Sequence, residues 1–97
     1  MYGTIAKLKV LPGAMDAIRA MEARRPTGIV TSYVLKADTD PDELWLVALF
    51  ESKQAYEANA ASPEQDAEYW ALRKLLQQDP EWHDGAIVFD SQNMPPA

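Results

Sequence analysis

The chain has 97 residues and no cysteine, a size that suits one compact domain. Hydrophobic residues make up 47% and charged residues 25% of the sequence, which is ordinary globular usage and argues against intrinsic disorder or a fibrous repeat. Fifteen acidic against nine basic residues give a net charge of −6, so long-range repulsion makes nucleic acids and anionic membrane surfaces poor partners.

A strand and a helix are predicted at the start of the chain. From Tyr2 to Leu11, apolar side chains alternate with small or charged ones, which is the period of a half-buried strand. Pro12 and Gly13 break this pattern, and apolar residues then recur at helical spacing. This spacing predicts a helix that runs to about Arg25, before Pro26 ends it.

A hairpin is predicted next. The segment GIVTSYVLKA, from Gly28 to Ala37, is rich in β-branched residues, and LWLVALF, from Leu44 to Phe50, is almost wholly apolar. The polar connection between them, Asp38 to Glu43, is too short to hold a helix. The second and third strands should therefore pair with each other.

Two helical segments and a last strand complete the pattern. Ser52 is a candidate N-cap for a helix that runs to about Asn59. Ser62, Pro63 and Gln65 form a capping box with proline at the first helical position, so a second helix should begin there. This helix should present an apolar stripe to the sheet and end at Asp79 and Pro80; the stripe includes Ala67, Trp70, Ala71, Leu72, Leu75 and Leu76. Residues 82–85 read as a turn that leads into a short strand, AIVF, at 86–89.

The order strand, helix, strand, strand, broken helix, strand predicts an α+β fold. It is the ferredoxin-like βαββαβ arrangement, with a four-stranded antiparallel sheet in a single domain over residues 1–90 and a C-terminal tail over 91–97. The strands are apolar on both faces, whereas the helices can cover only one. We therefore expect a homodimer in which two sheets pack face to face as a dimeric α/β barrel.

Several polar and aromatic side chains are candidates for a binding pocket, although no sequence-specific signature joins them. They are Tyr33, Asn59, Tyr69, Trp70, Arg73 and His83. Most also have a plain structural interpretation: Trp70 as a core side chain, Arg73 as a solvated one, Asn59 as a helix C-cap and Tyr33 as a packing residue.

His83 is the side chain whose ordinary pKa best suits a general base at neutral pH, and Asp84 beside it is a candidate orienting carboxylate. Adjacent residues of a strand point to opposite faces, however, which argues against that dyad. The alternative is that His83 is an exposed turn residue.

Metal and cofactor sites are not expected. Without cysteine there is no thiolate ligand, and a single histidine cannot form a multi-histidine site within one chain. No G-x-S-x-G nucleophile elbow occurs, and the four glycines are scattered instead of forming a phosphate-binding loop. The longest apolar run is far below the roughly 20 residues that cross a bilayer, and the N-terminus does not resemble a signal peptide, so a cytoplasmic location is expected.

From Tyr2 to Asp90 the chain resembles the antibiotic biosynthesis monooxygenase-like family of the dimeric α/β-barrel superfamily. The residues that carry the resemblance are the first strand ending at Leu11, Pro12 and Gly13, and the segment DPDELWLVALFESKQAYEANAASPEQ from Asp40 to Gln65. The family includes cofactor-free oxygenases of quinol-like or anthrone aromatics, haem-degrading enzymes and proteins without assigned activity. Residues typical of the haem-degrading branch are not matched here, since Gly3 or Thr4, Asn59, and Tyr69 or Trp70 stand at the corresponding places.

The resemblance implies a cofactor-independent monooxygenase that oxidises a quinol-like or polycyclic aromatic compound with O2. By residue type, Asn59, Tyr33, Trp70 and Arg73 are the counterparts of the groups that position the substrate, with Tyr69 nearby and His83 and Asn59 as the catalytic candidates. The alternative is a non-catalytic dimeric barrel that binds a small ligand. A third interpretation is an isomerase or lyase in which His83 transfers the proton.

Overall fold

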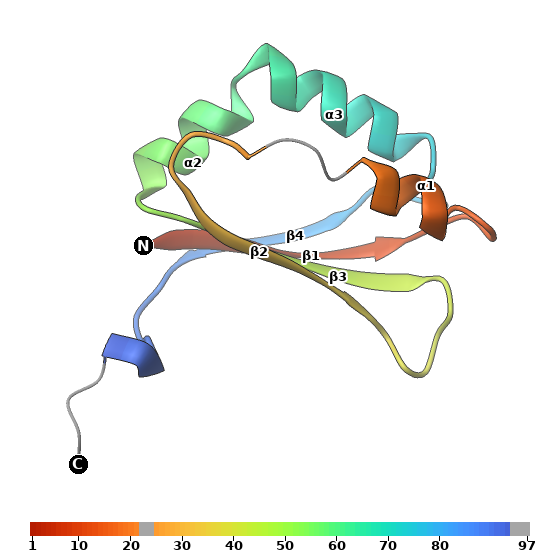
Figure 1. The fold of residues 1–97 in the computed structure, drawn as a ribbon, viewed down its shortest axis with the longest axis horizontal. Helices are drawn as coiled ribbons and strands as arrows, with labels where there is room; N and C mark the ends of the chain where they lie inside the picture. The colour runs from red at the N-terminus through yellow and green to blue at the C-terminus, as the bar shows by residue number, and fades with distance from the viewer. Residues whose placement is uncertain (22–24, 94–97) are drawn as a thin grey trace.

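The computed structural model describes residues 1–21 and 25–93, and they form one antiparallel sheet with its three α-helices on a single side (Figure 1). The strands are β1 (Tyr2–Lys9), β2 (Ile29–Lys36), β3 (Glu43–Phe50) and β4 (Glu81–Ala86), in the spatial order β2-β3-β1-β4. The helices are α1 (Met15–Ala20), α2 (Lys53–Ala60), α3 (Pro63–Arg73) and the short 3-10 turn η1 (Ser91–Asn93). This is the predicted ferredoxin-like βαββαβ fold.

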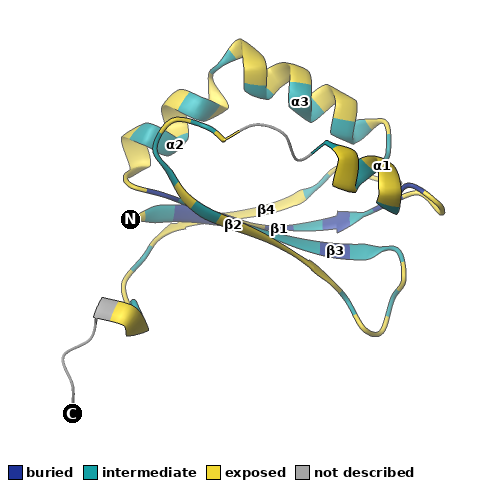
Figure 2. Ribbon diagram, viewed as in Figure 1, coloured by how far each residue is buried: buried dark blue, intermediate teal, exposed yellow. Residues whose placement is uncertain are grey.

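The core lies between β1, β3 and the helices. Alternate residues of β1 and β3 face the helical layer, where Ala6, Leu8 and Leu44 are buried together with Val10 and Leu76 (Figure 2). Half-buried side chains of α1 and of the end of α3 pack against this cluster. The first strand is central because it pairs with β3 on one side and β4 on the other.

The predicted hairpin of β2 and β3 is confirmed. A bulge near the start of β2, however, changes which of its side chains face the helices. Tyr33 lies opposite Val47, and Ile29 lies opposite Phe50, with a register shift between Ile29 and Thr31. The extra residue moves Ile29 to the helix-facing side, whereas Tyr33 stays on the open side. Strict alternation along the sequence would place both side chains on one face, and the bulge separates them.

Both predicted helix starts are confirmed by their hydrogen bonds. The Ser52 hydroxyl accepts the Ala55 N–H at 3.1 Å, and the Ser62 hydroxyl accepts the Gln65 N–H at 3.1 Å. The Ser62 hydroxyl also donates to the Asn59 carbonyl at 2.7 Å, which joins the end of α2 to the start of α3.

The first and third helices are shorter than their sequences predict. The first ends at Ala20, and residues 22–24 of the expected helix lie outside the described residues. The third ends at Arg73 instead of Asp79, because Leu76 leaves the helix to form a bridge with Val10. Its outer face carries Trp70, which is 57% exposed, so the expectation that Trp70 belongs to the buried stripe is wrong.

The last strand occupies residues that the sequence assigned to a turn. It pairs with β1 from Tyr2 opposite Ala86 to Lys7 opposite Glu81. Because β1 begins at Tyr2, pairing ends after Ala86, and the more β-prone residues 87–89 follow the strand instead of forming it. The Ile87 N–H makes one further hydrogen bond, to the Met1 carbonyl at 2.9 Å.

The face of the sheet opposite the helices is apolar and uncovered within the described residues (Figure 1). Tyr33 and Leu35 are 61% and 54% exposed, and Ile5 is 45% exposed. Half-buried Val47 and Leu49 lie between them in the register of the sheet. The prediction of an apolar second face holds for β2, β3 and Ile5 of β1, whereas Lys7, Glu81 and His83 make the part of this face around β4 polar. Among the described residues, no helix has the length and apolarity that a membrane span requires.

Candidate functional site

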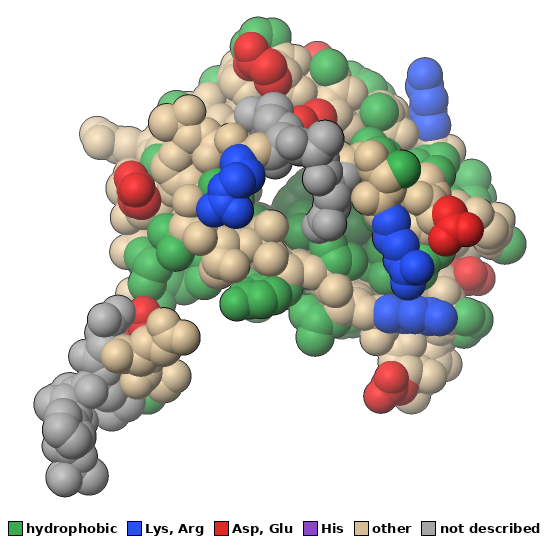
Figure 3. All heavy atoms as spheres, viewed as in Figure 1, with side chains coloured by type: hydrophobic (Ala, Val, Ile, Leu, Met, Phe, Trp, Pro, Cys, Tyr) green, Lys and Arg blue, Asp and Glu red, His purple; other side chains and the backbone are tan. Residues whose placement is uncertain are grey.

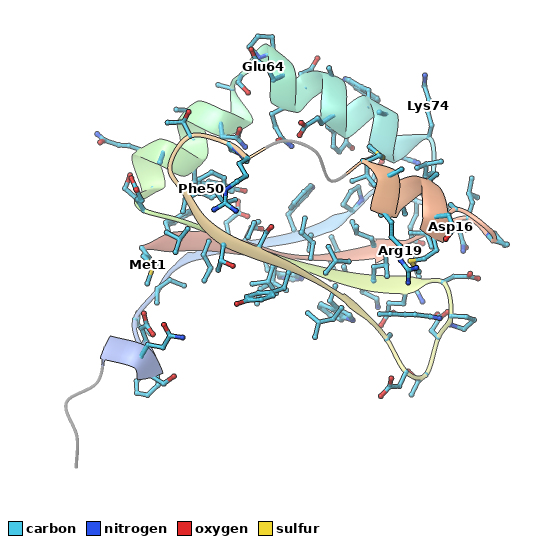
Figure 4. All side chains as sticks on the ribbon, viewed as in Figure 1. Met1, Asp16, Arg19, Phe50, Glu64 and Lys74 are labelled. Carbon is cyan, nitrogen blue, oxygen red and sulfur yellow. The ribbon has the colours of Figure 1, made fainter. Side chains whose placement is uncertain are left out.

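A cavity of about 420 Å³ lies between the sheet and helices α2 and α3. Figure 3 shows a hollow between the two layers, and Figure 4 shows the side chains that both layers send into the space between them. Four aromatic rings line the cavity: Phe50, Tyr56, Tyr69 and Trp82. Its apolar walls and small polar set are typical of a binding site for a small molecule.

Tyr56 is the residue that joins the elements around the cavity. Its hydroxyl donates a hydrogen bond to Asp84 Oδ1 at 3.0 Å, which links α2 to β4. Its ring lies 5.2 Å from that of Tyr2 and 5.5 Å from that of Phe50. Burial, and then the Asp84 carboxylate, raise the pKa of Tyr56 to about 12, so the phenol stays protonated at neutral pH.

Local structure explains why this pair meets. Tyr56 lies in the first turns of the helix that Ser52 caps, and its N–H donates to the Ser52 carbonyl at 3.1 Å. On β4, Asp84 lies opposite Thr4 and Trp82 lies opposite Ala6, and both partners on β1 are buried on the helix-facing side. Strand alternation therefore directs Asp84 and Trp82 toward the cavity.

Polar side chains at the joint between α2 and α3 form another part of the wall. Asn59 Nδ2 donates to Gln65 Oε1 at 3.3 Å, and both residues line the cavity. Asp66, in the first turn of α3, lines it as well. The lining thus carries two carboxylates, those of Asp66 and Asp84, and within the described residues it has no lysine, arginine or histidine.

Of the six site residues predicted from the sequence, Asn59 and Tyr69 line the cavity. Tyr33 lies on the open face of the sheet, and Trp70 lies on the outer face of α3, in edge-to-face contact with Tyr69 at 5.2 Å. Arg73 Nε donates to Asp79 Oδ1 at 2.8 Å, and its Nη1 donates to the Leu76 carbonyl at 3.3 Å. This pairing holds Arg73 at the far end of α3, away from the cavity lining.

His83 lies opposite Ile5, on the open face of the sheet. Its Nε2 lies 3.4 Å from Glu81 Oε1, two residues away on the same strand face. Asp84 points to the other face, so the expected separation of His83 from Asp84 is confirmed. The structure brings His83 together with the open-face residues and not with Asn59 or Tyr69.

Sequence reasoning missed Tyr56, Asp84 and Trp82 as cavity residues. A signal for Tyr56 existed, because Tyr56 and Asn59 are three residues apart on one predicted helix and so share a face. No comparable signal existed for Asp84 or Trp82, since residues assigned to a turn have no assigned face.

The described residues contain no group of three or more histidine, cysteine, aspartate or glutamate side chains that could hold a metal ion. In the connection between β2 and β3, the Asp40 carboxylate is held by groups of the protein itself. It accepts a hydrogen bond from Lys9 Nζ and another from the Asp42 N–H at 2.9 Å.

No family model matches the sequence, and no curated protein matches it. Among solved structures, a protein classed among the antibiotic biosynthesis monooxygenases, from Chloroflexus aurantiacus J-10-fl, is 27% identical with a TM-score of 0.76, over 92% of this chain and 94% of that chain. A mutant of SnoaB, a cofactor-independent oxygenase from Streptomyces nogalater, is 19% identical with a TM-score of 0.80, over 93% and 95%.

A third neighbour, also classed among these monooxygenases and from Deinococcus radiodurans, is 15% identical with a TM-score of 0.79, over 98% of this chain and 100% of that chain. The neighbours below 25% identity are evidence for the fold alone. The neighbour at 27% identity supports the resemblance to the antibiotic biosynthesis monooxygenase-like family that the sequence indicates, and the other two support the shared fold.

Proposed function

We propose that this chain, which is similar in fold to the antibiotic biosynthesis monooxygenases, is a cofactor-independent oxygenase of a small quinol-like or polycyclic aromatic compound. The observation that carries the proposal is the cavity of about 420 Å³, with its four aromatic rings and the Tyr56–Asp84 hydrogen bond in its wall. This volume lies within the range of roughly 300–1,000 Å³ that is common for small-molecule sites.

The chemistry begins with a proton transfer from the substrate. Asp84 Oδ1 accepts the Tyr56 hydroxyl, and its carboxylate takes a proton from an acidic O–H or C–H of the aromatic substrate. Because the phenol of Tyr56 is protonated at neutral pH, it serves as a hydrogen-bond donor that holds this carboxylate in place. We therefore assign the base to Asp84 and not to His83, which lies on the other face.

The electron-rich substrate anion then reduces O2 directly. The anion and O2 combine to a peroxide anion, which takes the proton back from Asp84 to become a hydroperoxide. The hydroperoxide then loses water and leaves a new carbonyl oxygen on the ring. For an anthrone, one ring CH2 and one O2 give one C=O and one H2O. For a quinol with a ring C–H, one quinol and one O2 give one hydroxyquinone and one H2O, so in both cases the substrate supplies all the electrons. Buried Phe50 shields one side of the reactive anion from water, Trp82 adds an aromatic wall, and Asn59 and Tyr69 position the ring.

The proposal includes a homodimer. The open face of the sheet exposes Ile5, Tyr33 and Leu35, and leaving such side chains in water forgoes a stabilisation of about 25 cal/mol per Å² of apolar surface. A second copy packed face to face would cover them with a matching surface, and two-fold pairing is the commonest oligomer. The cytoplasmic location and the absence of a cofactor stay predictions from the sequence.

Oxygen uptake tests the oxygenase. Metal-stripped protein incubated with menadiol or an anthrone should consume O2 well above the spontaneous rate, and the Asp84→Asn variant should lose most of this excess. Asp38→Asn is the matched control, because Asp38 lies in the β2–β3 connection, outside the cavity lining.

Equal rates with and without protein would exclude the oxygenase. Quenching of tryptophan emission by the same compounds, without turnover, would favour the alternative of a non-catalytic ligand-binding barrel, since Trp82 lines the cavity.

A further inference from the structure

We infer that the cavity selects aromatic compounds that carry a protonated amine and rejects aromatic carboxylates. The inference rests on the proposed use of this cavity as the ligand site, and it adds the charge of the ligand, which the family resemblance leaves open. It also differs from the expectation that Arg73 helps to position the substrate, because Arg73 is paired with Asp79 instead.

The charge of the lining carries the first step. Asp66 on α3 and Asp84 on β4 face the same space from opposite layers, and no cationic side chain of the described residues lines it. Arg25 precedes the lining residue Pro26, but it is exposed and not itself part of the lining. A carboxylate ligand would meet two like charges, whereas an ammonium group would meet two opposite ones.

The hydrogen-bonding capacity of the wall points the same way. The Tyr56 hydroxyl donates its hydrogen to Asp84, and Thr4 Oγ1 donates to the His83 carbonyl at 3.4 Å. The second carboxylate oxygen of Asp84 remains, and the Asp66 carboxylate has no hydrogen bond or ion pair among the described residues. Both side chains are exposed, so water occupies these acceptor sites until a ligand that brings donors displaces it, and an ammonium group brings three.

The aromatic rings add a third contribution. Phe50, Tyr56, Tyr69 and Trp82 line the same cavity as the two aspartates. Ring faces attract cations and stack with an aromatic ligand, so the same walls hold both parts of an aryl-alkyl ammonium ion. The net charge of −6 raises the local concentration of cations further.

Three naphthalenes that differ mainly in charge provide the test: 1-naphthylmethylamine, 1-naphthalenemethanol and 1-naphthoate, titrated into the intact protein by calorimetry at low salt. The amine should bind about tenfold more tightly than the alcohol, as partly exposed carboxylate contacts and cation–π contacts together predict. The naphthoate should bind more weakly than the alcohol. Added salt should narrow the difference between amine and alcohol.

Variants connect the preference to the two carboxylates. Asp66→Asn and Asp84→Asn should each reduce the preference for the amine and leave the affinity for the alcohol nearly unchanged, while Asp38→Asn should alter neither. Equal binding of amine and alcohol, tightest binding of the naphthoate, or no binding by any of the three would each overturn the inference.

Oxygen uptake is measured separately, so the two proposals fail independently. Oxygen uptake with menadiol but no preference for the amine would contradict only the inference about the charge of the ligand. Selective binding of the amine, with no oxygen uptake in the presence of any substrate, would contradict only the proposed oxygenase activity.

Discussion

The Tyr56 hydroxyl and the Asp84 carboxylate are joined by a 3.0 Å hydrogen bond that connects helix α2 to the edge strand β4. One contact thus fixes the wall of the cavity and tethers a strand that has a neighbour on one side only. An edge strand of the sequence EWHDGA has little β-propensity of its own. Its position therefore depends on pairing with β1 and on this tether.

Replacing Tyr56 by phenylalanine keeps the ring contacts with Tyr2 and Phe50 and removes only the hydrogen bond. We expect the free energy of unfolding to fall by about 0.5–1.5 kcal/mol in urea denaturation. Oxygen uptake should fall about tenfold, mainly in kcat, because Asp84 loses the donor that orients it. Tyr33→Phe, on the open face, is the control and should leave kcat unchanged. An unaltered kcat in Tyr56→Phe would contradict the role given to Tyr56.

The raised pKa of Tyr56 predicts a loss of stability in alkali. The folded protein holds the pKa of Tyr56 at about 12, above its ordinary value of 10.0. The stabilisation is thus fully present below pH 10.0 and is lost as the pH rises toward about 12, because the unfolded chain releases this proton first. The free energy of unfolding should decline over this interval, and the decline should be shallower in Tyr56→Phe. If the free energy of unfolding falls with pH at the same slope in the unmodified chain and in Tyr56→Phe, the pKa of Tyr56 is the same in the folded and unfolded chain.

The two serine caps should differ in their contribution. Ser52 makes one capping bond, to the Ala55 N–H, whereas Ser62 accepts the Gln65 N–H and also donates to the Asn59 carbonyl. Replacing an N-cap serine by alanine costs about 1 kcal/mol, so Ser52→Ala should lose about that amount. Ser62→Ala should lose more, by about 0.5–1.5 kcal/mol for the second hydrogen bond. Thermal unfolding of both variants measures the difference, and a larger loss in Ser52→Ala would be the contrary result.

Two glycines with nearly equal backbone angles allow steric contact to be separated from backbone strain. Gly13 has φ 82° and Gly28 has φ 83°, a region that L-residues rarely adopt. A Cβ on Gly13 would meet no atom within 4 Å, whereas one on Gly28 would lie 2.7 Å from Ala55 Cβ. Gly13→Ala should therefore cost about 1–2 kcal/mol from strain. Gly28→Ala should cost at least about 1 kcal/mol more, because α2 must move.

Local sequence signals predicted the features that depend on neighbouring residues. They failed where pairing between distant segments sets the bounds of a strand or the direction of a side chain. The Ser62 capping box lies within four residues and was found. The position of β4 is set by where β1 begins, at Tyr2, so the β-prone segment 87–89 lies beyond the last paired residue, Ala86. The cavity residue Asp84 was missed for the same reason, since its face follows from that register.

The lack of a local signal also explains why Trp70 was expected to be buried and is exposed. A helix with apolar residues around much of its circumference does not reveal which of them face the sheet, and α3 directs Tyr69 and Leu72 inward but leaves Trp70 exposed. The bridge between Val10 and Leu76, which ends the helix early, joins residues 66 positions apart and has no local sequence signal.

The open face of the sheet predicts a two-fold interface that a single charge should break. Leu35 is 54% exposed on this face, beside Trp45 in the register of β2 and β3. If a second copy covers the face, Leu35→Asp places two carboxylates in the interface, one from each copy, and desolvating them is strongly unfavourable. Sedimentation velocity at micromolar concentration should show a dimer for the unmodified chain and a monomer for Leu35→Asp.

Trp70→Asp is the matched control, because Trp70 is similarly exposed, at 57%, but lies on the outer face of α3, on the opposite side of the sheet. It should remain dimeric. If the unmodified chain sediments as a folded 10.8 kDa monomer, no second sheet covers this face. The cavity would be unaffected by that result, since every residue named in its wall belongs to one chain.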